Sequence, residues 1–341
     1  MKHISILVIA FIVSLTSCSK SSGPGNTGHP PSNLVLTATV NPDSSGNVSF
    51  TASATDAVNF EYNFGNSVIQ TVPTGIVTYK YAASGNYVVT VTAKSADGST
   101  VSTTTSITVN LPLTLFWSEE FNTDGPPDPA KWGYDIGNNG GWGNAELEYY
   151  TNRPENAVVQ GGVLKINAIK ESYSGSAYTS ARLLSQNKFA FTFGKVLVRA
   201  KLPAGVGTWP AIWMLGSNIN TVSWPSCGEI DIMEHLGRDL NKIYGTLHYP
   251  GRSGGNADGG TLMISNATTA FHIYRLDWTP SIIQIYVDDQ LVHTVTNSGS
   301  IPFNHDFFFI LNVAMGGNFG GPVDPAFTAA TMEVDYVRVF K

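Results

Sequence analysis

Apolar and polar residues alternate with a period of two through most of the chain. Residues 163–168, 195–201 and 282–287 are examples, and turn-forming Gly, Asn, Asp and Pro residues separate such runs. Side chains at alternate positions of a strand point to opposite faces of a sheet, so these runs predict strands with one buried face. We find no convincing long amphipathic helix and no internal repeat. The pattern therefore predicts an all-β protein.

The predicted strands fall into two groups. Short alternating runs, such as 34–40 and 87–92, recur over residues 33–110 at the spacing of a small β-sandwich. The boundary falls near residues 111–113, and the chain from 113 to 341 forms one larger β-rich unit. Many antiparallel strands over that length predict a two-sheet sandwich or jelly roll.

The first residues form a targeting segment that is left out of the fold. Lys2 gives a positive start, and the apolar run 4–13 is too short for a comfortable membrane span. Residues 1–17 resemble a bacterial lipoprotein signal peptide with Cys18 as the lipidated residue; an ordinary secretory peptide is the alternative. Residues 18–32, rich in Ser, Gly and Pro, predict a tether. We expect an exported lipoprotein of the outer membrane that touches the membrane only through this lipid.

Composition and charge exclude some function classes. Charged residues make up 13% of the 341 residues, and the formal net charge is −6. Nucleic acid would call for a basic patch, so a neutral polymer is the more suitable partner. Cys227 is the only cysteine besides Cys18, so a lipidated Cys18 leaves no disulfide. Among apolar strand residues, Cys227 is expected to be a small buried hydrophobe rather than a nucleophile.

Residues 229–234 carry the candidate chemistry, three carboxylates placed between apolar residues. A regular strand puts Glu229 and Asp231 on one face but turns Glu234 to the other. A bulge at residues 232–233 would return Glu234 to the first face. The wet face of an edge strand would also explain three acids. Nearby tryptophans favour a glycan cleft instead, because indole faces stack on sugar rings; they are Trp209, Trp213, Trp224 and Trp278.

Paired carboxylates across a scissile bond are what glycoside hydrolysis needs, one as nucleophile and one as proton donor. Crowding should raise the pKa of at least one of the three acids, which could then hold the proton. In a flat strand with the bulge, the Cα atoms of Glu229 and Glu234 are about 13 Å apart. A concave sheet could give the carboxyl spacing of about 5–5.5 Å used for retention, and a flat one the inverting spacing of about 6.5–9.5 Å. The pattern leaves both open.

The segment 224–234, WPSCGEIDIME, resembles the active-site strand of glycoside hydrolase family 16. Two residues between Asp and the second Glu are shared by the laminarinase, agarase and carrageenase branches of that family. Further segments resemble the laminarinase branch in particular: 141–151, 178–182, 207–215, 245–249 and 311–319. The resemblance runs from about residue 116 to 341. It implies a concanavalin-like β-jelly roll, a retaining mechanism and endo-acting hydrolysis of β-1,3-glucan by a monomer.

The resemblance also implies roles for single residues. Glu229 would attack the anomeric carbon, Glu234 would act as acid and then base, and Asp231 would hydrogen-bond Glu229. His248 would lie near the acids or be a satisfied core histidine. The other positions that contact sugar in the family match Asn156, Arg182, Trp213, Trp224 and Asn312.

Catalysis of this kind would need no cofactor. Glu120 and Asp335 match segments that bind a structural calcium ion in many relatives, and carboxylate oxygens suit calcium. Two ordinary surface acids are the equal alternative. A divalent cation would then have no part in the reaction itself.

Residues 60–65 and 79–87 resemble the PKD module, an immunoglobulin-like β-sandwich of secreted polysaccharide enzymes. Asn66 and Ser67 replace the acidic residues usual there. Residues 33–110 are thus expected to be a spacer, with glycan binding as the alternative. For the larger unit, mixed-linkage β-glucan or an agar-type galactan is the alternative substrate. A catalytically inactive glycan-binding lipoprotein is the alternative outside enzymes, which the presence of both glutamates disfavours.

Overall fold

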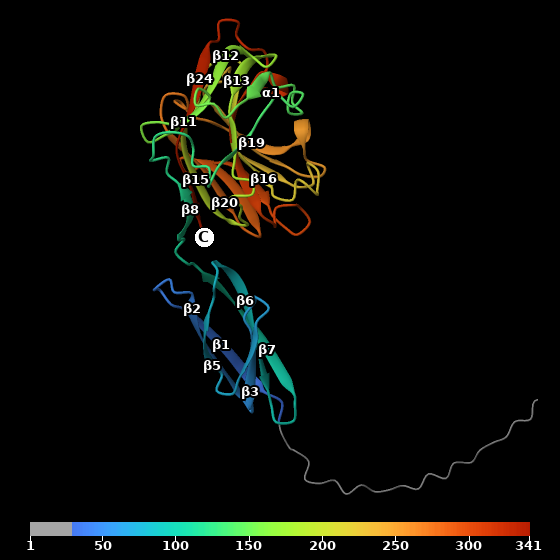
Figure 1. Ribbon diagram of the computed structural model, residues 1–341. Coiled ribbons are helices and arrows are strands. Elements are labelled where there is room, and N and C mark those ends of the chain that lie inside the picture. The colour runs from blue at the N-terminus through green and yellow to red at the C-terminus, as the bar shows by residue number, and fades with distance from the viewer. Residues whose placement is uncertain (1–28) are drawn as a thin grey trace, which may run out of the picture. The chain divides into compact units, whose positions relative to one another are not determined.

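The computed structural model describes residues 29–341, so the leader and Cys18 lie outside the described residues (Figure 1). The chain divides into two compact units between Pro112 and Leu113. Over the described range, regular structure is almost entirely strand, with one 3-10 turn (Gly254–Asn256) and one short helix, α1 (Gly317–Gly320). No helix within residues 29–341 is long and apolar enough to cross a membrane. The all-β prediction is confirmed.

The smaller unit is a sandwich of two antiparallel sheets. Its strands are β1 (Ser32–Val40), β2 (Asn47–Thr55), β3 (Asn59–Asn63), β4 (Ile69–Val72), β5 (Ile76–Lys80), β6 (Gly85–Lys94) and β7 (Thr100–Val109). One sheet has the order β1-β2-β5 and the other β4-β3-β6-β7. Alternate residues of the facing strands form one core, in which Phe50, Tyr62, Phe64 and Tyr81 are fully buried.

The larger unit has one wide sheet of ten strands. Its strands are β8 (Leu115–Glu119), β10 (Glu148–Tyr150), β11 (Ala157–Val159), β12 (Leu164–Tyr173), β13 (Ser176–Ser180), β15 (Gly194–Lys201), β20 (His272–Trp278), β21 (Ile282–Val287), β22 (Gln290–Thr296) and β24 (Ala329–Phe340). They run in the order β10-β13-β12-β24-β15-β20-β21-β22, with β11 beside β12 and β8 beside β24.

A seven-stranded sheet packs against the wide one. Its strands are β9 (Gly133–Asp135), β14 (Arg182–Leu184), β16 (Thr208–Gly216), β17 (Glu229–His235), β18 (Lys242–His248), β19 (Asp258–Met263) and β23 (Phe307–Met315), in the order β19-β18-β17-β16-β23-β14-β9. A single core of aliphatic and aromatic side chains joins the two sheets. The jelly-roll sandwich is thus confirmed, and the acidic strand β17 lies near the middle of its smaller sheet.

Candidate active site

The acidic strand β17 contains the predicted bulge. Between Asp231 and Glu234 it has two residues, whereas β16 has only Ile212 and β18 only Gly245 opposite them. Residues 232–233 both turn into the core, where they are fully buried. The extra residue therefore returns Glu234 to the face of the other two acids, as a bulge next to an active site commonly does.

A cleft of about 1000 Å³ lies over these three carboxylates. Strands of the seven-stranded sheet line it from Arg182 on β14 to Thr261 on β19, with the acids of β17 between them. Its aromatic lining consists of Trp142, Trp209, Trp213, Trp224, Tyr244 and Phe319. A floor of acids between indole and phenyl rings matches the composition of a sugar-binding cleft.

Glu229 accepts a hydrogen bond from an indole and lies near an imidazole. The Trp224 indole N–H donates to its Oε2 at 2.9 Å, and His248 Nε2 lies 3.7 Å from its Oε1. Burial and then the charge of Asp231 raise the pKa of Glu229 to about 8, while His248 and the Trp224 hydrogen bond oppose this shift. Since an indole N–H cannot accept, its contact favours the ionised form of Glu229.

Glu234 has a different pair of partners. The Trp209 indole N–H donates to Oε1 at 3.0 Å, and the Thr246 hydroxyl lies 3.3 Å from Oε2. A hydroxyl can donate or accept, so Oε2 is the oxygen of Glu234 that can carry a proton. Burial raises the pKa of Glu234, against the opposing effects of Trp209, His248 and Thr246. Burial raises the pKa of both glutamates, and their partners distinguish them: the Thr246 hydroxyl can accept a hydrogen bond from a protonated Glu234, whereas the Trp224 indole N–H favours the carboxylate form of Glu229.

Asp231 lies between these two glutamates and is 4% exposed. Burial and the charge of Glu234 raise its pKa well above the usual range, and it is hydrogen-bonded to Glu229. His248 lies near the acids, as one of the two predictions had it, with Nε2 3.2 Å from Asp231 Oδ2. The backbone N–H of Gly254 donates to His248 Nδ1 at 3.2 Å, so a neutral imidazole carries its proton on Nε2, the nitrogen that lies near Asp231.

This tautomer bears on metal binding at the same place. Ligand atoms of Glu229, Asp231 and His248 lie within 4.8 Å of one another, the one such group of His, Cys, Asp and Glu found within residues 29–341. A metal at Nε2 would require the proton on Nδ1, where the Gly254 N–H already points. The Gly254 contact therefore disfavours metal coordination through Nε2 of His248.

One end of the cleft holds a stack of side chains. The Arg182 guanidinium lies 4.8 Å from the ring centres of both Trp142 and Trp213, and its Nε is 3.0 Å from Asp135 Oδ2. The Trp213 indole N–H donates to Asn312 Oδ1 at 2.8 Å. These contacts hold the indole of Trp213 from its face and from its edge.

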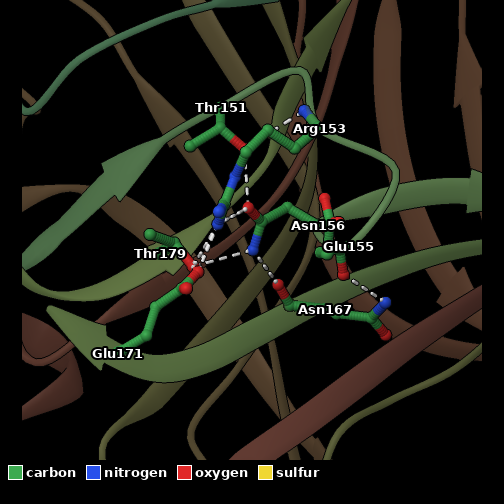
Figure 2. Close-up of polar contacts among 7 residues, drawn as sticks. All are labelled: Thr151, Arg153, Glu155, Asn156, Asn167, Glu171 and Thr179. Carbon is green, nitrogen blue, oxygen red and sulfur yellow. Dashed lines mark hydrogen bonds and ion pairs between the residues drawn. The ribbon is translucent and has the colours of Figure 1, made fainter. Parts of the chain in front are cut away.

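The predicted site residues Arg182, Trp213, Trp224, His248 and Asn312 all line the cleft with the acids. Asn156 does not. It is fully buried, and its amide donates to Asn167 O and Thr179 Oγ1 while accepting from Thr151 Oγ1 and Arg153 Nη2 (Figure 2). All four hydrogen-bonding positions of Asn156 are occupied, so we correct its predicted sugar contact to a structural role.

Two further sequence expectations are settled by burial. Trp278 is 1% exposed and belongs to the core, with its indole N–H donating to Phe303 O, so it is not a cleft residue. Cys227 is fully buried, and burial raises the pKa of its thiol to about 11. A thiol of that kind is unreactive, which agrees with the structural reading of Cys227.

The side chains proposed to hold calcium have other partners. Arg338 donates to Glu120 through Nε at 2.9 Å and Nη2 at 2.7 Å, and Arg199 donates to Asp335. The guanidinium of Arg338 holds the pKa of Glu120 below its usual range. Each carboxylate thus pairs with an arginine, as an ordinary surface acid also can, and calcium binding by Glu120 and Asp335 stays a prediction.

Several cleft residues were missed because no motif of their own marks them. They are Trp142, Thr246, Tyr244, Glu146 and Phe319. Trp142 and Glu146 lie within the segment 141–151 that resembled the laminarinase branch, which was the one available signal. Thr246 could have been found from its position on the strand next to the acids, directly opposite Asp231.

The two-sheet jelly roll and the aromatic cleft over paired carboxylates define a glycoside hydrolase. The chain matches the model of glycosyl hydrolases family 16 over residues 144–338, and that of the PKD domain over 22–109. The chain belongs to glycosyl hydrolases family 16, and a PKD domain precedes its catalytic unit.

Individual relatives agree with this assignment. The chain is 46% identical over 243 residues to a beta-glucanase of Rhodothermus marinus, covering 67% of this chain and 85% of that protein. Among solved structures, it is similar to the laminarinase from Rhodothermus marinus, with 46% identity, a TM-score of 0.65 and 98% of that chain covered. The laminarinase catalytic domain from Thermotoga petrophila RKU-1 gives 44% identity, a TM-score of 0.63 and 98% coverage; each match covers 67% of this chain.

Proposed function

We propose that the protein is an endo-acting β-1,3-glucan hydrolase that retains anomeric configuration. The observation that carries the proposal is the placement of Glu229 and Glu234 on one face of β17. Glu229 accepts from the Trp224 indole N–H, which can only donate, whereas Glu234 has, besides the Trp209 indole N–H, the Thr246 hydroxyl, which can donate or accept. Relatives that are named laminarinase or glucan hydrolase support β-1,3-glucan as the substrate.

In the first step, a Glu229 oxygen attacks the anomeric carbon and forms a covalent glycosyl ester. The bond from that carbon to the leaving sugar oxygen breaks, and Glu234 transfers its proton to that oxygen. Asp231 stabilises the charge state of Glu229 through their hydrogen bond, and His248 orients Asp231 through its Nε2 proton.

In the second step, Glu234 is a carboxylate and removes a proton from water. The water oxygen attacks the anomeric carbon from the face that the leaving sugar vacated, and the bond to Glu229 breaks. Two inversions give net retention. Every proton and electron pair in this cycle is carried by the chain, the glucan or water, so the proposal needs no cofactor.

The direction of the cleft supports attack within a glucan chain. Its lining includes residues of the six neighbouring strands β19, β18, β17, β16, β23 and β14. Strands lie about 4.8 Å apart, so the cleft crosses roughly 24 Å of sheet. The acids of β17 lie between its ends, which leaves room for sugar rings on both sides of the scissile bond.

Chromatography of the products from laminarin, lichenan and agarose tests this proposal. We expect a ladder of short oligosaccharides from laminarin at early times, slower release from lichenan and none from agarose. Faster cleavage of lichenan would favour mixed-linkage β-glucan, and products from agarose alone would favour a galactan. Release of glucose only would contradict endo action.

We further propose that the protein is exported and held at the outer membrane by a lipid on Cys18, as a monomer. The support is the sequence of residues 1–18, with its basic start, apolar run and small residues before the cysteine. Growth with a labelled fatty acid tests this. Label should enter the wild type and be lost in Cys18→Ala.

Deleting residues 19–110 is expected to leave kcat and KM for soluble laminarin within about twofold of the full chain. The reason is that the smaller unit has its own core, separate from the one that supports the cleft. Initial rates on soluble laminarin and on a short oligosaccharide measure this. A large loss on the oligosaccharide would show instead that the PKD domain helps to form the cleft.

A further inference from the structure

Two glutamates that the reaction does not use lie in contact beside the cleft. Glu146 lines the cleft and is 8% exposed, whereas Glu148, at the start of β10, is fully buried. The backbone N–H of Met315 donates to Glu148 Oε2 at 2.6 Å. Its Oε1 has no N–H or O–H donor, and its carboxyl lies within hydrogen-bonding reach of the Glu146 carboxyl.

A chain of hydrogen bonds connects Glu146 to the indole of Trp213, and its direction can be fixed. An indole N–H only donates, so the Asn312 atom 2.8 Å from it is the oxygen. The Asn312 nitrogen therefore faces Tyr150 and donates to its hydroxyl oxygen at 3.0 Å. The Tyr150 hydroxyl must then donate onward, which it does to Glu146 Oε2 at 3.1 Å.

Glu146 is thus the acceptor at the end of the chain. Its other oxygen accepts from the Asn144 amide at 3.1 Å, so both oxygens of Glu146 act as acceptors, as those of a carboxylate do. A second ionised carboxylate in contact with it and shut off from water would be strongly unfavourable. A proton on Glu148 removes that repulsion and gives Glu146 a third donor.

We propose that Glu148 and Glu146 are positioning residues for the indole of Trp213. Glu148 stays protonated and donates a hydrogen bond to Glu146. The chain then passes through Tyr150 and Asn312 to the indole N–H, while Arg182 holds the ring from its face. The inference rests on the proposed function only in treating Trp213 as a surface that binds sugar.

The pKa of Glu148 agrees with this assignment. Burial, and after it the charge of Glu146, raise it well above the usual range, which keeps the proton in place at neutral pH. Three other titratable groups are near: Tyr150 in the same segment, Tyr178 opposite Glu148 on β13, and Arg182, whose charge acts on Tyr150. The one hydrogen bond that strand β23 donates to the side chains of Glu146 and Glu148 comes from the Met315 backbone N–H.

Two substitutions of Glu148 separate the proton from the shape of the side chain. In Glu148→Gln the amide N–H can replace the carboxyl O–H, and the carbonyl can still accept from Met315. We expect KM for a laminari-oligosaccharide within about twofold of wild type. Glu148→Met has a similar shape but neither function, and should raise KM tenfold or more with kcat changed less than threefold. Equal KM values for the two variants would overturn the proposal.

A double-substitution test asks whether the effect passes through Trp213. Trp213→Phe lacks the indole N–H, so adding Glu148→Met to it should shift KM by less than a further twofold. A full tenfold rise in KM in the Trp213→Phe background would show that the effect of Glu148 does not pass through the hydrogen bonds to the Trp213 indole. Ser185→Ala is a matched control, because Ser185 accepts from the Phe309 backbone N–H of the same strand β23, away from the cleft. It should lower stability without moving KM.

Thermal unfolding measured as a function of pH tests, without any substrate, whether Glu148 is protonated in the folded protein. The pKa of Glu148 is raised in the folded state, so unfolding releases a proton once the pH exceeds the ordinary glutamate value. The Tm of the wild type should therefore fall relative to that of Glu148→Gln as pH rises from 4 to 8. If the Tm values of the two proteins changed in parallel over this pH range, the proposal that Glu148 is protonated would be wrong. A failure of β-1,3-glucan as substrate would leave this result untouched, and the kinetics would then use whichever glucan is cleaved.

Discussion

Replacing Glu229 by alanine is expected to abolish glucan cleavage while the protein folds normally. Without the carboxylate, no covalent ester forms, and loss of a nucleophile lowers kcat by about 10⁴-fold or more. The fold should persist because the charges of Asp231 and Glu234 raise the pKa of the buried Glu229, so removing its carboxyl relieves repulsion. Initial rates on laminarin, with thermal unfolding of both proteins, measure the two expectations.

Azide provides a positive test of the same variant. In the space left by Glu229, azide can attack the anomeric carbon of a substrate with a good leaving group and give a glycosyl azide of inverted configuration. Recovery of that product would identify the missing group as the nucleophile. Glu333→Ala is the control, because Glu333 lies on the other sheet in an ion pair with Lys201 and should retain full activity. Hydrolysis by Glu229→Ala within tenfold of wild type would contradict the assignment.

The strand that carries the acids was predictable because its information is local. A period of two and the requirement that Glu234 join Asp231 were enough to place the bulge at residues 232–233, which the pairing of β17 confirms. The buried positions also follow from local sequence, since apolar residues on one face of a strand must enter the core. No long-range contact had to be known.

Asn156 was placed wrongly because a match to a motif does not show where an amide points. Its position in the chain was compatible with a cleft, but Arg153, Thr151 and Thr179 occupy its hydrogen-bonding groups. The last of these is 23 residues away, on strand β13. The surroundings of Glu120 also depend on a distant residue, because its partner Arg338 lies 218 residues further along the chain.

The acid pair Glu146 and Glu148 also depends on distant contacts. In the sequence the two residues alternate with Leu147 and look like the solvated face of a strand. The structure places the Tyr150 hydroxyl beside Glu146, and the Met315 backbone N–H beside Glu148. Asn312, 162 residues from Tyr150, and Met315, 167 residues from Glu148, thus supply the contacts from which we infer which glutamate accepts and which holds the proton. The period-two pattern of the sequence carries no information about these distant contacts.

Replacing Glu234 by alanine should have an effect that depends on the leaving group. A polysaccharide leaves as an alkoxide that needs the Glu234 proton, so kcat on laminarin should fall by about 10²–10⁴-fold. An aryl glycoside with an acidic phenol leaves without that help, so its first step should stay within about tenfold of wild type. A burst of phenol followed by slow turnover would then appear, because the second step lacks its base. Stopped-flow absorbance measures both phases, and equal losses on the two substrates would contradict the role.

The pH profile supplies the second test of Glu234. Burial raises its pKa in the folded enzyme, so the proton remains bound above the usual glutamate range and is lost as pH rises through the raised value. Wild-type kcat/KM on laminarin should therefore fall on the alkaline side. With the aryl substrate, Glu234→Ala should lose that alkaline fall but keep the acidic one, which reports ionisation of the nucleophile. Retention of the alkaline fall in Glu234→Ala would assign the proton to Asp231 instead, because Asp231 is the carboxyl on this face of β17 that remains besides the nucleophile, and burial raises its pKa as well.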